Sequence, residues 1–123
     1  MKFRVKVKKL DSFTELDIGR KIFDLTWQPF QSTEVTSNLL KALVHSGAYL
    51  SGAFIKEKCV GAALAFPATT GGLYLHSHMT AVLDKYRDNG IGYSLKIDQW
   101  NWAKKITFAQ KYQDLFVLYI LSY

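Results

Sequence analysis

The stretch from Tyr86 to Lys96, YRDNGIGYSLK, places two glycines two residues apart, after a strand-like segment and where a helical pattern begins. At the start of a helix several backbone N–H groups have no partner within the helix, and the helix dipole favours negative charge there. Because Gly90 and Gly92 carry no Cβ, an anion can approach this backbone closely. The stretch therefore predicts a loop that binds a phosphate or pyrophosphate.

Two common phosphate-binding motifs do not fit this loop. GIG at 90–92 lacks the third glycine of a dinucleotide-binding fingerprint, and no Gly-Lys-Ser/Thr sequence follows it as in a P-loop. A different nucleotide-like ligand is therefore expected.

Length and composition favour one globular domain in a reducing compartment. The 123 residues suffice for a single core, and 49% of them are hydrophobic. The single Cys59 cannot form an internal disulfide, and cations interrupt the apolar residues of the N-terminal MKFRVKVKK, so no signal-peptide core is present. The longest apolar run, LFVLYIL at 115–121, is too short to span a membrane. We therefore expect a cytoplasmic protein without a membrane partner.

The net charge of +6 favours anionic partners such as phosphates. It does not by itself predict nucleic-acid binding, because a basic stripe is non-specific and exposed edge strands commonly carry one. The aromatic residues that could stack on bases fall into helical patterns and are expected in the core: Phe13, Phe23, Trp27, Trp100 and Trp102. A nucleic-acid partner is therefore not expected.

The first part of the chain predicts a strand followed by two helices. FRVKVKK at 3–9 alternates apolar and basic residues, which is typical of a half-exposed strand. Ser12 and Glu15 have the spacing of a helix capping box, and Pro29 ends the helix that they begin. STEVTSNLLKALVHSG at 32–47 has the apolar spacing of a second helix.

The rest of the chain predicts three consecutive strands, a helix and a last strand. AYLSGAFI at 48–55, CVGAALAF at 59–66 and GLYLHSHMTAVL at 72–83 are joined by segments short enough for hairpins, so they should form an antiparallel meander. A helix runs from the glycine loop to about Ile106, and LFVLYIL at 115–121 suits a buried strand. The expected fold class is mixed α/β (α+β) in the order β-α-α-β-β-β-α-β, with the meander followed by the phosphate-binding loop and its helix.

The segment MTAVLDKYRDNGIGYSLKIDQWNWA at 79–103 resembles the coenzyme A-binding segment of the GNAT superfamily of N-acetyltransferases. The signature of that superfamily, R/Q-x-x-G-x-G/A at a strand-loop-helix junction, reads here as RDNGIG at 87–92. The order of the preceding elements agrees with the first part of the GNAT fold, and LYLHSHMTAVL at 73–83 resembles one little-characterised subgroup. The resemblance covers residues 3–106.

The resemblance implies an acyl-CoA-dependent N-acetyltransferase, with acetyl-CoA as co-substrate and a small-molecule or peptide amine as acceptor. By position, backbone groups of Ala81, Val82 and Leu83 would contact the pantetheine arm. The residues that would hold the pyrophosphate are Arg87, Asp88, Asn89, Gly90, Ile91 and Gly92. Transfer in this superfamily is usually direct, so no covalent intermediate is required. Cys59 is accordingly expected to be a small buried thiol.

Two histidines on the strand before the loop are candidate bases for the amine's proton. Alternation predicts His76 and His78 on one face with Thr80, opposite Leu75 and Met79, and a histidine can accept a proton near neutral pH. The alternative, that one or both are hydrogen-bonded structural residues, stays open. A metal site is not expected, because no third ligand of suitable spacing stands beside the pair.

The chain ends earlier than the GNAT fold normally does. We expect residues 1–123 to form a single GNAT-like domain that is apparently truncated and lacks the C-terminal helix and strands, which would impair acetyl transfer. The alternative function is a non-catalytic remnant or interaction module that associates through an exposed sheet edge. We also expect the strand at 115–121 to pair beside the strand that carries the histidines and to join two copies into a homodimer.

Overall fold

The computed structural model of the chain describes residues 3–27, 35–72, 74–109 and 117–120. Its elements are β1 (Lys6–Lys9), α1 (Phe13–Trp27), α2 (Ser37–His45), β2 (Tyr49–Ile55), β3 (Lys58–Ala68), β4 (Tyr74–Val82), the 3₁₀ helix η1 (Asp84–Tyr86), α3 (Ile91–Ala109) and β5 (Val117–Ile120). This order confirms the expected mixed α/β fold class. Pro29, the expected end of the first helix, lies outside the described residues.

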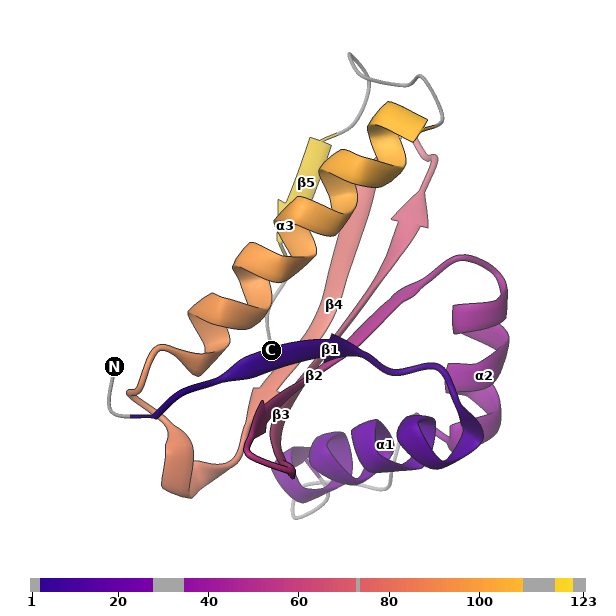
Figure 1. Cartoon of the computed structure of the whole chain (residues 1–123). Helices are drawn as coiled ribbons and strands as arrows, with labels where there is room; N and C mark the ends of the chain where they lie inside the picture. The colour runs from indigo at the N-terminus through magenta and orange to yellow at the C-terminus, as the bar shows by residue number, and fades with distance from the viewer. Residues whose placement is uncertain (1–2, 28–34, 73, 110–116, 121–123) are drawn as a thin grey trace.

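The strands form one five-stranded sheet in the order β1-β2-β3-β4-β5 (Figure 1). The first four strands pair antiparallel, which confirms the predicted meander, and β5 pairs parallel to β4. Tyr74 to Ser77 face Val117 to Ile120, so the predicted pairing of the tail beside the histidine strand is confirmed for residues 117–120. Among the described residues β5 is therefore an edge strand.

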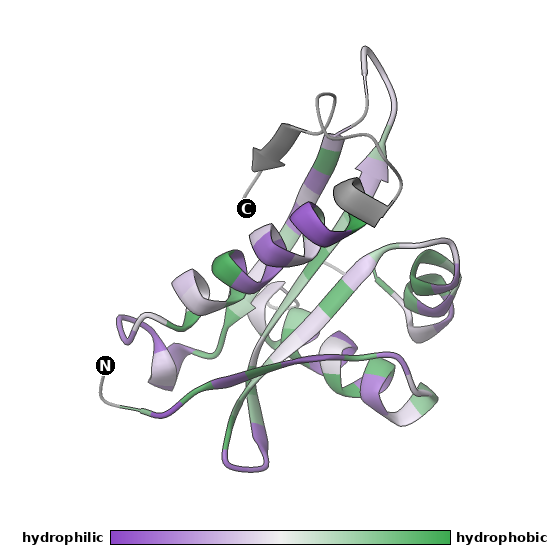
Figure 2. Ribbon diagram, turned by 45° about the horizontal axis from the view of Figure 1, so that its top comes forward, coloured by the Kyte–Doolittle hydropathy of each residue, from purple (hydrophilic) through white to green (hydrophobic). Residues whose placement is uncertain are grey.

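Helices cover the sheet on both faces. On one face α1 and α2 pack through buried residues such as Leu16, Phe23 and Leu40, and on the other α3 packs through Ile91 and Leu95. Figure 2 shows hydrophobic and hydrophilic residues interspersed along α1 and α3, as expected for helices with one buried side. No helix in the described part of the chain is long and apolar enough to cross a lipid bilayer.

The alternation predicted for the histidine strand is wrong beyond His78. The register shifts within the β3–β4 pair, where Leu64 faces Met79 and Ala65 faces Ser77, so His78 is the extra residue of a β-bulge. Such a bulge exchanges the faces of all later residues. Met79 therefore lies in the cluster under α1 and α2, whereas Leu75 lies in the cluster under α3. A pattern of period two cannot show this exchange, because it contains no information on the partner strand.

The predicted capping box at the start of α1 is confirmed. The amide of Glu15 donates to Oγ of Ser12 at 3.2 Å, and the amide of Ser12 donates to Oε1 of Glu15 at 3.1 Å. Hydrogen bonds from the backbone of Ser12 and Asp11 lower the pKa of the Glu15 carboxyl group. The cap thus fixes the residue at which the chain turns from β1 into α1.

Replacing Ser12 by alanine is expected to lower the free energy of unfolding by about 1 kcal/mol, the usual effect of removing a helix cap. The contribution of Glu15 depends on pH, because its folded pKa lies below the ordinary value of 4.5. That contribution is fully present above the ordinary pKa and is lost as the pH falls through the folded value. Urea denaturation at neutral and acidic pH measures both effects. Thr14→Ala, an exposed change in the same turn, is the control, and equal stability of the Ser12 variant and native chain would contradict the assignment.

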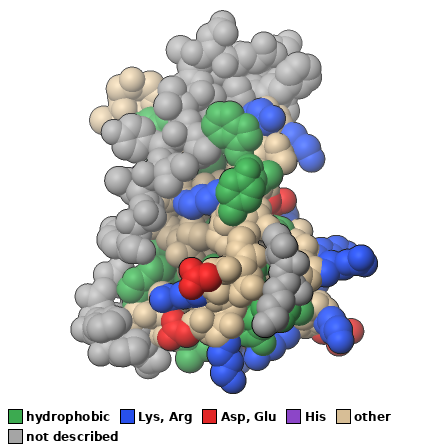
Figure 3. Space-filling view, turned by 90° about the vertical axis from the view of Figure 1, so that its left-hand side faces the viewer, with side chains coloured by type: hydrophobic (Ala, Val, Ile, Leu, Met, Phe, Trp, Pro, Cys, Tyr) green, Lys and Arg blue, Asp and Glu red, His purple; other side chains and the backbone are tan. Residues whose placement is uncertain are grey.

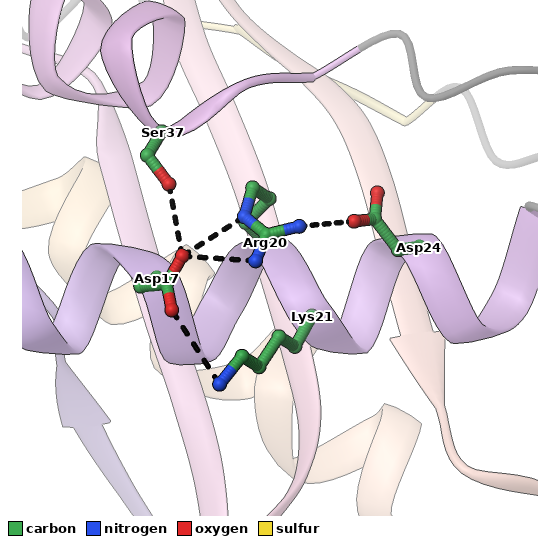
Figure 4. Close-up of polar contacts among 5 residues, drawn as sticks. All are labelled: Asp17, Arg20, Lys21, Asp24 and Ser37. Carbon is green, nitrogen blue, oxygen red and sulfur yellow. Dashed lines mark hydrogen bonds and ion pairs between the residues drawn. The ribbon is translucent and has the colours of Figure 1, made fainter.

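A network of polar side chains joins α1 to the start of α2 (Figure 4). Asp17 accepts hydrogen bonds from Nε of Arg20 at 3.0 Å and from Oγ of Ser37 at 3.2 Å, and Arg20 also pairs with Asp24. The hydrogen bond from Arg20 is the main reason that the pKa of the Asp17 carboxyl group is lowered. The network holds the two helices that cover one face of the sheet in a fixed relation.

Candidate active site

The loop between β4 and α3 is shaped to present backbone amides. Asp88 and Gly90 have positive φ angles of 64° and 77°, and the amide of Ser94 donates to the carbonyl of Gly90 at 3.0 Å to begin the helical hydrogen bonds. The amides of residues 91–93 precede that bond and so lack intrahelical acceptors. Alternating left- and right-handed residues before such amides form the concave backbone that binds anions.

Two side chains of the loop hold its backbone in place. Nδ2 of Asn89 donates to the carbonyls of Tyr86 at 3.1 Å and Arg87 at 2.8 Å. Arg87 pairs with Asp84 at 3.2 Å and donates its Nε–H to the carbonyl of Val82 at 3.2 Å. The loop is therefore tied both to itself and to the end of β4.

A cleft of about 740 Å³ lies beside this loop, within the size range of small-molecule and cofactor sites. Its described lining comes from the end of α1, the second half of β4, the loop and the first turns of α3. Because α1 and α3 lie on opposite faces of the sheet, the cleft reaches both faces.

Along the cleft β4 has no described partner strand on one side. The described pairing between β4 and β5 covers Tyr74 to Ser77, so among the described residues no strand pairs with 78–82 on that side. Thr80, Ala81 and Val82 line the cleft. Thr80 Oγ1 is buried there and has no hydrogen-bond partner within the described part of the chain. The end of β4 thus offers a polar strand edge next to the anion-binding loop.

Most of the residues predicted to bind the coenzyme lie together in this cleft. Those that line it are Ala81, Val82, Arg87, Asp88, Gly90, Ile91 and Gly92. Leu83 and Asn89 do not line it. The amide of Leu83 donates to the carbonyl of Val60 at 2.8 Å, and its side chain packs against the core under α1 and α2.

The two glycines of the loop are required for different reasons. Gly90 has a φ of 77°, a conformation that side chains with a Cβ rarely adopt. At Gly92 the backbone is ordinary, and an added Cβ would approach only Cγ2 of Val82, at 4.0 Å. A side chain at position 92 would therefore be tolerated by the fold and would occupy the cleft.

His76 and His78 lie on the α1 and α2 face of β4, in contact with each other. Nε2 of His76 and Nδ1 of His78 are 3.2 Å apart, and both rings lie against Phe66, with centroids at 5.0 and 5.5 Å. A hydrogen bond between two ring nitrogens requires that one of them be the acceptor. Neither histidine lines the cleft, but His78 is the bulge residue, two positions before Thr80.

Two residues of the cleft, Lys96 and Thr80, were not predicted as site residues from the sequence. Lys96 lines the cleft from α3, and its Nζ donates to Oγ of the fully buried Ser77 at 2.7 Å. The available signal was helical spacing, since Gly92, Lys96 and Gln99 follow one another at intervals of four and three residues on a side that is partly or fully buried. A lysine and a glutamine in that stripe are unusual for a core-facing side.

Cys59 does not have the properties of a nucleophile. Its Sγ donates to the carbonyl of Gly61 at 3.3 Å, and burial raises the pKa of the thiol. The thiolate is the reactive form, and this environment disfavours it. The half-buried thiol therefore agrees with a packing role.

The side of the molecule where α3 begins carries both signs of charge. Figure 3 shows acidic and basic side chains close together on this side, with hydrophobic side chains above them. On α3 the exposed apolar residues are Tyr93, Ile97 and Trp100.

Comparison with known proteins identifies the fold. No protein-family model matches the chain, and no curated protein matches it. Among solved structures, AAC(6′)-Iy in complex with the bisubstrate analogue CoA-S-monomethyl-acetylneamine is similar with a TM-score of 0.76 and 13% identity, over 98% of this chain and 79% of that chain. An aminoglycoside acetyltransferase from an uncultured soil metagenomic sample has a TM-score of 0.72 and 15% identity, over 97% and 76%.

A third similar structure has a different acceptor in its name. The ribosomal-protein-alanine N-acetyltransferase from Brucella melitensis biovar Abortus 2308 matches with a TM-score of 0.65 and 16% identity, over 94% of this chain and 79% of that chain. The glycine loop, the element order and these structural matches agree. The chain therefore has the fold of the GNAT superfamily of N-acetyltransferases.

Proposed function

We propose that this chain binds acetyl-CoA in the cleft beside the glycine loop and transfers the acetyl group to an amine. The observation that carries the proposal is that one cavity is lined both by the start of α3, with its free amides, and by the end of β4, which has no described partner strand on that side. The similar structures named above are acetyltransferases, and one of them holds a coenzyme A analogue.

The residues of the cleft fit the chemical parts of the coenzyme. The amides of residues 91–93 would bind the pyrophosphate, and Gly92 leaves room for it. The strand edge at Ala81 and Val82 and the hydroxyl of Thr80, which has no partner among the described residues, would bind the amides of the pantetheine arm. An acyl thioester bound there supplies an activated carbonyl group.

The histidine pair is the candidate base. As the amine nitrogen bonds to the carbonyl carbon, it must lose a proton, and His78 or His76 would accept that proton through its neutral imidazole. The bond from the carbonyl carbon to sulfur breaks in the same transfer, and its electron pair leaves with the sulfur. The reaction is balanced without a covalent enzyme intermediate.

Titration calorimetry with acetyl-CoA on the 123-residue chain tests the proposal. We expect a dissociation constant in the range of about 1 μM to 1 mM, as is usual for enzyme substrates. Pantetheine, which lacks the pyrophosphate, is the control and should bind far more weakly. Absence of heat with acetyl-CoA, together with an unchanged melting temperature, would contradict the proposal.

The acceptor class proposed is a small-molecule or peptide amine, because the similar proteins include an aminoglycoside acetyltransferase and a ribosomal-protein-alanine N-acetyltransferase. The alternative function, an interaction module, is favoured by one observation, the position of β5 at the sheet edge within the described residues. An edge strand offers unpaired backbone groups to a second copy. The homodimer through this strand and the cytoplasmic location therefore remain predictions.

A further inference from the structure

Lys96 is a partly buried cation that the function proposed above does not use. It projects from α3 into the cleft, and its Nζ lies 2.7 Å from Oγ of Ser77. It makes no ion pair with any described residue. A cation held against a neutral hydroxyl has capacity for an anionic partner.

The side chain of Lys96 reaches β4 at a point some distance from the loop. Gly92 lies beside Val82 at one end of the cleft, and Lys96 reaches Ser77, five residues further back on the strand. At about 3.3 Å per residue, that separation along β4 is roughly 16 Å. An extended arm anchored at the loop and running along the unpaired edge of β4 therefore leads toward Nζ of Lys96.

Four other ionisable side chains line the described part of the cleft. The described groups that line it are Tyr86, Arg87 and Asp88 at the loop and Tyr93 in the first turn of α3. On the same helix Asp98 accepts a hydrogen bond from the hydroxyl of Tyr49 at 2.7 Å. These two residues line a different cavity. On β4 the histidines contact Phe66 on the opposite face of the sheet. Burial lowers the pKa of the Lys96 ammonium group, which makes it a stronger acid than an exposed lysine.

We propose that Lys96 lies beside the sulfur of bound coenzyme A and donates the proton that the departing thiolate takes up. This inference rests on the proposed function. When the bond from the carbonyl carbon to sulfur breaks, sulfur keeps the electron pair and forms a new bond to a proton of the Lys96 ammonium group. The neutral amine that remains regains a proton from water, since the cleft is open. The acid and the base of the reaction then lie on opposite faces of β4.

The test is the ionisation of coenzyme A in its complex with the chain, followed by thiolate absorbance as a function of pH. A neighbouring ammonium group lowers the pKa of a thiol, so we expect at least about tenfold more thiolate in the native complex than in free coenzyme A below the thiol's ordinary pKa. Lys96→Met should abolish this excess. Lys96→Arg should keep it, because the charge remains, but should slow acetyl transfer, because arginine is not deprotonated in proteins.

The matched control is Lys104→Met, which removes the same charge from an exposed position of α3. It should leave the excess of thiolate unchanged. Coenzyme A that binds without any excess of thiolate would overturn the inference and leave the proposed function standing, as would an excess that survives in Lys96→Met. If Lys96→Met does not fold, the inference is tested by whether the native complex shows the excess of thiolate. Failure of the native chain to bind coenzyme A would overturn both.

Discussion

A leucine in place of Gly92 is expected to weaken binding of coenzyme A by at least about tenfold, or about 1.4 kcal/mol, without loss of stability. The side chain would stand in the cleft at the start of α3, between the amides of the first turn and a bound pyrophosphate. Its Cβ would make one ordinary contact, with Val82 at 4.0 Å, so the fold has room for it. Leucine also favours a helix over glycine by up to about 1 kcal/mol, so stability should be equal or higher.

Titration calorimetry and thermal unfolding measure the two effects separately. Asn101→Leu adds the same side chain to an exposed position of α3 away from the loop and serves as the control. Gly90 is less suitable for this test, because its positive φ makes any substitution strained and would lower stability as well. Unchanged affinity of the Gly92 variant would show that the pyrophosphate does not lie on this loop.

The fold could be predicted from the sequence because local signals agreed with one another. The capping box at Ser12 and Glu15, the hairpin connections and the glycine loop each depend on a few adjacent residues. Such features are encoded within a turn or two of chain, so a single sequence is sufficient to read them. The pairing of 117–120 beside β4 was predicted without its parallel direction, because a long-range pairing has no local signal.

The site could be predicted only in part. RDNGIG at 87–92 identified the loop, but the cavity is lined by α1, β4 and α3 together, and no short stretch of sequence marks how these elements meet. The extra residue at His78 was likewise invisible, since a bulge is defined by the partner strand. Lys96 was not predicted as a site residue, because its neighbour Leu95 already fitted the apolar stripe expected to face the core in that turn of the helix. Each of these missed features arises from the relation between two elements.

The bulge also bears on the histidines, which are the residues expected to affect the reaction most. Replacing His78 by glutamine should lower kcat by roughly 10²- to 10⁴-fold, the usual contribution of a general base. We expect a smaller loss for His76→Gln, because a bulge re-aims the side chain of the extra residue and His78 is that residue. The affinity for coenzyme A should stay the same in both variants, since neither histidine lines the cleft.

The competing explanation is that the pair only stabilises the fold, through its mutual contact and its packing on Phe66. Steady-state rates with an amine found by screening, compared with thermal unfolding, separate the two. His45→Gln, at an exposed position of α2, should change neither quantity. A lower melting temperature with an unchanged kcat would assign the pair a structural role. Recovery of the rate of His78→Ala by added imidazole would instead identify proton transfer as the lost step, because free imidazole can replace a base but cannot restore packing between β4 and Phe66.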